Sequence, residues 1–170
     1  MAQGRDCIIG IDPGSRRTGF GIVARQAGGF VYVASGCIRL PQAEHPERLA
    51  HLFHAIKALL HDYNPEVLVL EQAFVGISAA SALKLGQARG VVMCAAALQR
   101  VEFAEYSPAS IKQAVTGGGR ADKAQVQKMV QHWLHLPATP AEDAADALAA
   151  AICHMIQSPL TAIVGLRKSS

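Results

Sequence analysis

The sequence has few charged residues and no hydrophobic run long enough to cross a membrane. Charged types make up 17% of its 170 residues, whereas hydrophobic types make up 51%. This balance leaves ample apolar surface to bury, and it excludes intrinsic disorder and fibrous repeats. No run reaches the roughly 18 apolar residues of a membrane span, and the N-terminal residues lack signal-peptide features. We therefore expect a soluble, cytoplasmic protein, and the length favours a single domain.

The sequence also lacks the cysteine spacing of a zinc site or a disulfide framework. Its four cysteines are far apart in apolar stretches, without a CxxC or Cys/His pattern, so we expect reduced core thiols. The net charge of +3 is too small to indicate a nucleic-acid partner by itself. The distribution of charge is more informative, since a basic stretch precedes an acidic one: Lys112, Arg120, Lys123 and Lys128, then Glu142, Asp143 and Asp146.

The hydrophobic pattern predicts an α/β domain with a mixed sheet. Three β-rich segments come first, at residues 6–12, 17–25 and 30–38. Helices at 46–63 and 78–99 then alternate with short apolar strands at 66–71 and 101–106, and three more helices are expected at 108–115, 122–135 and 141–156. This order predicts a five-stranded sheet, antiparallel across its first three strands and flanked by helices.

The segment 78–99 is apolar or small nearly all the way round. A helix of this kind is buried on more than one side. We expect a partner subunit to cover one of those sides.

Four carboxylates stand where a purely structural role is hard to assign. Asp12 and Glu71 each end an apolar strand, and strand ends in open α/β sheets are where ligands bind. Asp143 and Asp146 share one helical face that is otherwise alanine, and their charges repel each other. Without basic neighbours in sequence, the four form an oxygen-only set suited to Mg²⁺ or Mn²⁺. Carboxylates that hold two such ions are the apparatus of phosphodiester cleavage.

Structural explanations remain open for single members of this set. Asp143 falls in the first turn of its helix, where the helix dipole favours an acid. Asp12 precedes Pro13 and could be an ordinary turn aspartate, and Glu71 could simply terminate its strand. Asp146 lies deeper in the helix, where solvation explains it less well.

Four sequence strings, taken together and in order, resemble the RuvC family of crossover junction endonucleases, which resolve Holliday junctions. They are GIDPGSRRTGFGIV at 10–23, LEQAF at 70–74, SALKLGQARG at 81–90 and EDAADALAAAICH at 142–154. The first string alone is weak, because actin-like ATPases and sugar kinases begin with a similar strand and turn. The resemblance spans about residues 6–156.

The resemblance implies a ribonuclease-H-like fold in one nuclease domain over residues 1–170, with a short disordered C-terminal tail. It implies a homodimer that nicks four-way junction DNA in recombination and repair, using two Mg²⁺ ions per subunit or Mn²⁺ in their place. The partners implied are the branch-migration proteins RuvA and RuvB. The catalytic and metal-binding residues implied are Asp12, Glu71, Asp143 and Asp146.

The resemblance also implies DNA contacts from Phe74, Lys112 and Lys123. Phe74 would stack on a base, although a core aromatic is the alternative. Lys123 opens a helix, where a cation is unfavourable, and this favours a role facing DNA. Lys112 by itself would be an ordinary solvated lysine. The chain departs from its relatives at 75–78, Val-Gly-Ile-Ser in place of more polar residues, which leaves the sequence preference at the cleavage site open.

Two rival functions remain at this point. An actin-like ATPase or sugar kinase would use residues 10–14 to hold phosphate, but that class needs two such domains around the nucleotide. A junction-binding module without catalysis is the second rival, and the complete set of four carboxylates argues against it.

Overall fold

The structure, a computed structural model, describes residues 7–72 and 78–158. The strands within these residues are β1 Cys7–Asp12, β2 Arg17–Gln26, β3 Gly29–Arg39, β4 Val67–Glu71 and β5 Glu102–Tyr106. The helices are α1 His45–Tyr63, α2 Ala79–Leu98, α3 Pro108–Thr116, α4 Lys123–Trp133 and α5 Glu142–Gln157. Every element that the sequence predicts is present, with ends within about two residues of the expected positions.

The five strands form one mixed sheet in the order β3-β2-β1-β4-β5. β1 to β3 pair antiparallel, while β4 runs parallel to both β1 and β5. The predicted mixed sheet is therefore confirmed. Because β1 and β4 are parallel neighbours, their carboxyl ends meet at the same edge of the sheet.

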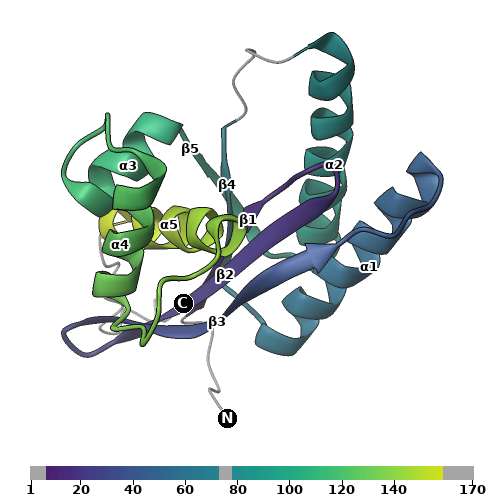
Figure 1. The fold of residues 1–170 in the computed structure, drawn as a ribbon. Helices are drawn as coiled ribbons and strands as arrows, with labels where there is room; N and C mark the ends of the chain where they lie inside the picture. The colour runs from purple at the N-terminus through teal and green to yellow at the C-terminus, as the bar shows by residue number, and fades with distance from the viewer. Residues whose placement is uncertain (1–6, 73–77, 159–170) are drawn as a thin grey trace, which may run out of the picture.

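Helices cover both faces of the sheet (Figure 1). On one face, α5 lies against the strands, and α3 and α4 pack on α5. On the other face lie α1 and α2, which pack on each other. Alternate residues of β1 supply the two cores: Ile8 joins Leu148 of α5, and Ile9 joins Ile56 of α1.

α5 packs directly on the strand backbones at glycine positions. A Cβ atom on Gly10 would lie 1.9 Å from the backbone oxygen of Ala147, and one on Gly19 would lie 2.0 Å from that of Asp143. No side chain fits between the helix and the strands at these points. This contact brings the acidic end of α5 next to the end of β1.

Local signals explain several helix ends. Asp122 and Gln125 form a reciprocal capping box at the start of α4, which confirms the cap that the sequence predicts at Asp122. The Ser107 side chain accepts a hydrogen bond from the Ser110 N–H at the start of α3. Asn64, with φ of 43°, ends α1 just before Pro65.

Within this chain α2 is buried along one side, and one of the expected core thiols lies on its exposed side. The side of α2 that packs in the core carries Ala88, Val92, Ala95 and Ala96. Another part of the helix is open, with Leu83 at 66% and Leu98 at 74% exposure. α2 is therefore buried along one stripe of this chain, because the sheet and α1 reach only that side. Cys94 is exposed on the same helix, so it is not a core thiol.

The four cysteines all lie within the described residues, and no disulfide joins them. In the same parts of the chain, no helix is both long and apolar enough to cross a bilayer.

Gly10→Ala should destabilise the fold by about 1 to 3 kcal/mol or more, the usual cost of forcing atoms into a packed core. The added methyl group would collide with the backbone of α5, which has no flexible side chain to move aside. Urea denaturation measures the change. Gly86→Ala is the matched control, since its Cβ meets nothing within 4 Å and alanine favours a helix by about 1 kcal/mol. Equal stability of Gly10→Ala and wild type would contradict the close packing of α5.

Candidate active site

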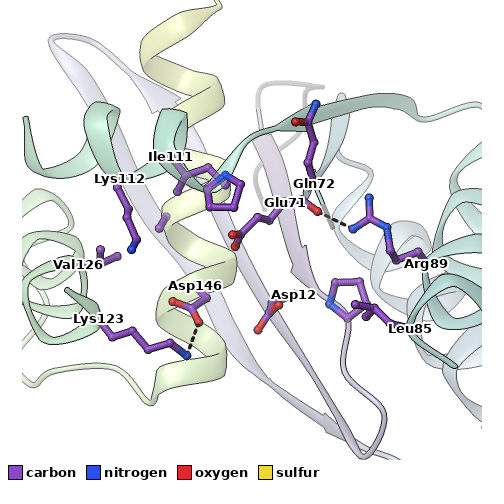
Figure 2. A pocket seen from close by; sticks show the side chains of 13 residues that line it. Asp12, Glu71, Gln72, Leu85, Arg89, Ile111, Lys112, Lys123, Val126 and Asp146 are labelled. Carbon is purple, nitrogen blue, oxygen red and sulfur yellow. Dashed lines mark hydrogen bonds and ion pairs between the residues drawn. The ribbon is translucent and has the colours of Figure 1, made fainter. Parts of the chain in front are cut away.

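Three of the four predicted carboxylates line one cavity at the edge of the sheet. Asp12 ends β1 and Glu71 ends β4, and the pairing of Ile11 with Leu70 puts these strand ends side by side. Asp146 reaches the same cavity from α5. Figure 2 shows their carboxylates pointing into a shared space, which has a volume of about 370 Å³.

Two lysines line the cavity from the α3 and α4 side (Figure 2). Lys123 is the first residue of α4, and its Nζ atom lies 3.8 Å from Asp146 Oδ2. The same ammonium group also pairs with Glu142. Lys112 comes from α3, so it faces the carboxylates and is not merely a solvated surface lysine. The structure thus brings both predicted lysines to the predicted acids.

Asp143 does not line the cavity. Its Oδ2 atom lies 3.8 Å from Arg17 Nε and accepts a hydrogen bond of 3.6 Å from the Cys37 thiol. These partners stand on β2 and β3, so Asp143 is held toward those strands. Its charge still acts on Asp12 and Asp146 and helps to raise the pKa of each. The predicted set of four therefore divides into three cavity residues and one neighbour.

Burial raises the pKa of each of the three cavity carboxylates. Burial is the main cause that raises the pKa of Asp12 to about 7, and repulsion from Asp146, Glu71 and Asp143 adds to it. Burial followed by repulsion from Asp146 also raises the pKa of Glu71, against the opposing effects of Lys112, Lys123 and Arg89. Burial raises the pKa of Asp146 despite the nearby Lys123. A cation added to the cavity would favour the ionised forms of all three acids.

The donor chemistry of the cavity fits a hard divalent cation. Asp12, Glu71 and Asp146 offer only carboxylate oxygens, which Mg²⁺ and Mn²⁺ prefer. Among the residues that the structure describes, no three acidic, histidine or cysteine side chains converge closely enough to form a ready-made set of ligands. Repulsion between uncompensated carboxylates opposes that convergence. The residues fit the cation in ligand type and in charge.

Arg89 is a cavity residue that the sequence reasoning did not single out. Its side chain is 13% exposed, and its Nη1 donates a hydrogen bond of 2.5 Å to the backbone oxygen of Glu71. Its Nη2 pairs with Glu105 on β5. Arg89 therefore ties α2 to the end of β4 and to β5. A positive charge near the middle of a helix rich in alanine and other small residues was the sequence signal for it.

Phe74 lies outside the described residues, as do the next three positions of the departing segment. Its predicted stacking on a base stays a prediction. Ser78, the last position of that segment, is described and caps α2 by accepting a hydrogen bond from the Ser81 N–H.

Asp12→Asn should stabilise the cation-free protein above pH 7. The pKa of Asp12 is about 7 in the folded protein and near 3.8 ordinarily, so the fold binds this proton more tightly than the unfolded chain does. The contribution of this group to the free energy of unfolding therefore falls as pH rises from about 4 to about 7. The amide cannot ionise and avoids that loss.

Calorimetry in EDTA at several pH values measures this difference. The gain of Asp12→Asn over wild type should be largest near pH 8 and should vanish near pH 4. Asp62→Asn, at an exposed position of α1, is the matched control for the loss of a carboxylate. A gain that is the same at both pH values would refute burial of an ionisable Asp12.

Comparison with known proteins identifies the family. The family model "Crossover junction endodeoxyribonuclease RuvC" matches residues 8–154. A protein of that name from Alkalilimnicola ehrlichii is 54% identical over 155 residues, covering 91% of this chain and 94% of its own length.

Solved structures agree with the sequence match. The Thermus thermophilus RuvC structure is 32% identical with a TM-score of 0.81, covering 89% of this chain and 95% of its own. T. thermophilus RuvC in complex with a Holliday junction substrate is 32% identical with a TM-score of 0.85. The match covers 90% of this chain and 94% of that chain. These matches confirm the predicted ribonuclease-H-like fold. The chain belongs to the RuvC family of crossover junction endodeoxyribonucleases.

Proposed function

We propose that this protein resolves four-way DNA junctions during recombination and repair by hydrolysing one phosphodiester bond in each of two strands. One observation carries the proposal: in a RuvC-family chain, Asp12, Glu71 and Asp146 line a single cavity together with Lys112 and Lys123. Carboxylates facing lysines form a site that can bind cations and a phosphate at the same place. The junction complex of the T. thermophilus relative supports the choice of substrate.

Asp12, Glu71 and Asp146 would hold the divalent cations, and Asp143 is the further candidate ligand. We propose Mg²⁺, two ions per subunit, with Mn²⁺ able to substitute. Bound ions of this kind activate water and stabilise the leaving oxygen in an in-line displacement at phosphorus. The reaction needs no covalent intermediate with the protein.

The other cavity residues have distinct tasks. Lys112 and Lys123 would neutralise the phosphate that enters beside the carboxylates, which lowers the repulsion between substrate and site. Arg89 is a positioning residue, because it contacts the backbone of Glu71 and leaves the carboxylate free. Stacking of Phe74 on a base of the opened junction completes the proposal, and it rests on the family resemblance.

The two rival functions are weaker. An actin-like ATPase or sugar kinase would hold a nucleotide phosphate against residues 10–14, whereas the cavity beyond β1 is lined by Asp12, Glu71 and Asp146. A junction-binding module would have no use for three partly buried acids whose pKa values are raised by burial.

We also propose a homodimer, since paired nicks in two equivalent strands need two sites. The open part of α2, with Leu83, Met93 and Leu98 exposed, is the surface that a second subunit would cover. RuvA and RuvB as partners, and the cytoplasm as the location, are part of this proposal.

Asp146→Asn should leave junction binding equal to wild type or slightly tighter, because it removes a negative charge from a phosphate site. The rate of nicking should fall by at least about a hundredfold, since even the outer contacts of metal ligands are worth roughly 10- to 100-fold. Nicking of a synthetic four-way junction in Mg²⁺, with binding measured in EDTA, separates the two effects. Combining Asp146→Asn with Asp12→Asn should cost much less than the product of the single losses.

Glu142→Gln is the matched control for this experiment. Glu142 lies on the same helix and contacts the same lysine, but it is exposed and does not line the cavity. This variant should nick within a few-fold of wild type. A folded Asp146→Asn variant that nicks within tenfold of wild type would remove Asp146 from the site.

Light scattering should find a dimer for wild type at micromolar concentration and a monomer for the Leu83→Glu/Leu98→Glu double variant. Both leucines are exposed on α2, so new charges there should block association without disturbing the core. Val31→Glu is the control, because Val31 is an exposed apolar residue on β3, away from that helix. A dimeric double variant would contradict this interface, and a monomeric wild type would contradict the dimer itself.

A further inference from the structure

A second, smaller hollow adjoins the active-site cavity across the loop that follows β1. Its polar and loop lining consists of Gly14 and Ser15 of that loop, His45 and Arg48 of α1, and Lys84 of α2. We call this hollow the basic slot. Leu40, Leu49 and Ala88 complete it. The two hollows share a wall, because Pro13 and Leu85 line the cavity while the adjacent Gly14 and Lys84 line the slot.

The basic slot carries positive charge without a matching acid. Arg48 and Lys84 both line it, and no Asp or Glu does. Within the described parts of the chain, neither side chain takes part in an ion pair or hydrogen bond. Glu44 and Glu47, the acids nearest to Arg48 in sequence, lie outside the lining. Two unpaired cations at one place attract an anion.

The Arg48 guanidinium has a donor that needs a partner. Its Nε atom is fully buried, and among the described residues no acceptor reaches it. Buried donors of charged groups are rarely left unpaired, because the loss of hydration is then uncompensated. An anionic group in the slot would compensate the charge of this guanidinium.

The walls of the basic slot are fixed by contacts of their own. The His45 ring is hydrogen-bonded to Gln87 Oε1 at 2.7 Å. The loop is held by Thr18, which is fully buried and accepts a hydrogen bond of 3.5 Å from the Gly14 N–H. Gly14 allows the tight loop, since a Cβ there would lie 2.2 Å from the backbone oxygen of Arg17. Fixed walls favour binding because little ordering is left to do.

The size of the basic slot restricts what can enter it. Its volume is about 10 Å³, which admits an atom or two and excludes a base, a nucleotide or a metabolite. An oxygen of a phosphate that passes over the opening fits this limit. Gly14 is two residues from Asp12, at most roughly 7 Å along the chain, so a strand cut beside Asp12 passes close by.

We propose that the basic slot binds a second backbone phosphate of the cleaved DNA strand, a few nucleotides from the scissile phosphate. Arg48 and Lys84 would then hold the strand on one side of Asp12, while Lys112 and Lys123 hold it on the other. The slot is a binding site and takes no part in the chemistry. This inference rests on the proposed junction-cleaving function.

The proposed phosphate binding in the slot is tested with the variants Arg48→Gln and Lys84→Gln. Their affinity for a four-way junction is measured in EDTA at a series of NaCl concentrations. Each variant should bind several-fold more weakly at moderate salt, with a salt slope smaller by about one phosphate contact. The rate of nicking in Mg²⁺ at limiting protein should fall along with the affinity. Lys57→Gln is the matched control, since it removes a cation from an exposed position of α1 outside the slot and should change nothing.

A methylphosphonate scan of the cleaved strand identifies the phosphate that is bound. One neutral substitution near the cut should weaken binding by wild type but not by Lys84→Gln, because the charge contact is already lost. Arg48→Lys, which keeps the charge and loses Nε, should fall between wild type and Arg48→Gln. If Arg48→Gln proves unstable, the affinity of Lys84→Gln and the methylphosphonate scan still test whether the slot binds a phosphate.

Wild-type affinity and salt slope in both Gln variants would overturn the slot while leaving junction cleavage intact. A scan in which no single position distinguishes wild type from Lys84→Gln would overturn it equally. Failure of wild type to nick junctions in Mg²⁺ would instead overturn the proposed function, so the two failures are distinguishable.

Discussion

The contact between α5 and the backbones of β1 and β2 determines where Asp146 lies relative to Asp12, and the pairing of β1 with β4 adds Glu71 beside them. At Gly10 and Gly19 the helix approaches so closely that even a methyl group would meet a backbone oxygen. This contact sets the depth and the position of the helix relative to the strand ends. Because Asp146 is rigidly attached to α5 and Asp12 ends β1, the distance between them is a property of backbone packing. A site built in this way does not depend on flexible loops to bring its acids together.

The same packing brings like charges together, and cations from other elements partly offset the repulsion between them. The carboxylates come from β1, β4 and α5, whereas the cations come from α2, α3 and α4. Lys123 illustrates the compromise: it starts α4, where the helix dipole disfavours it, and it contacts Glu142 and Asp146. Burial nevertheless raises the pKa of Asp12 to about 7, so ionising this acid has a cost in the cation-free protein. A divalent cation among the carboxylates would favour their ionised forms.

The sequence was sufficient to predict the order of elements, the mixed sheet and the placement of Asp12, Glu71 and Asp146 around one cavity. Those predictions depend on local patterns: an apolar strand that ends in an acid, or an acid within an alanine face. The direction of the Asp143 side chain was harder to predict, because residues three apart on a helix are turned about 60° from each other. That rotation directs Asp143 toward Cys37, which is 106 residues away in sequence. Arg89 and its contact with Glu71 likewise depend on tertiary packing that no local pattern encodes.

α2 links three requirements of paired cleavage in one rigid element. Leu83 and Leu98 present the surface proposed for the second subunit, Lys84 lines the basic slot, and Arg89 holds the end of β4. Residues on one helix keep fixed separations, at 1.5 Å of rise per residue. If two copies of α2 meet, the distance between the two cavities is then set by helix geometry and does not vary with the motion of loops. Arg89 contacts the backbone oxygen of Glu71, so the helix proposed for the dimer contact also holds the end of β4.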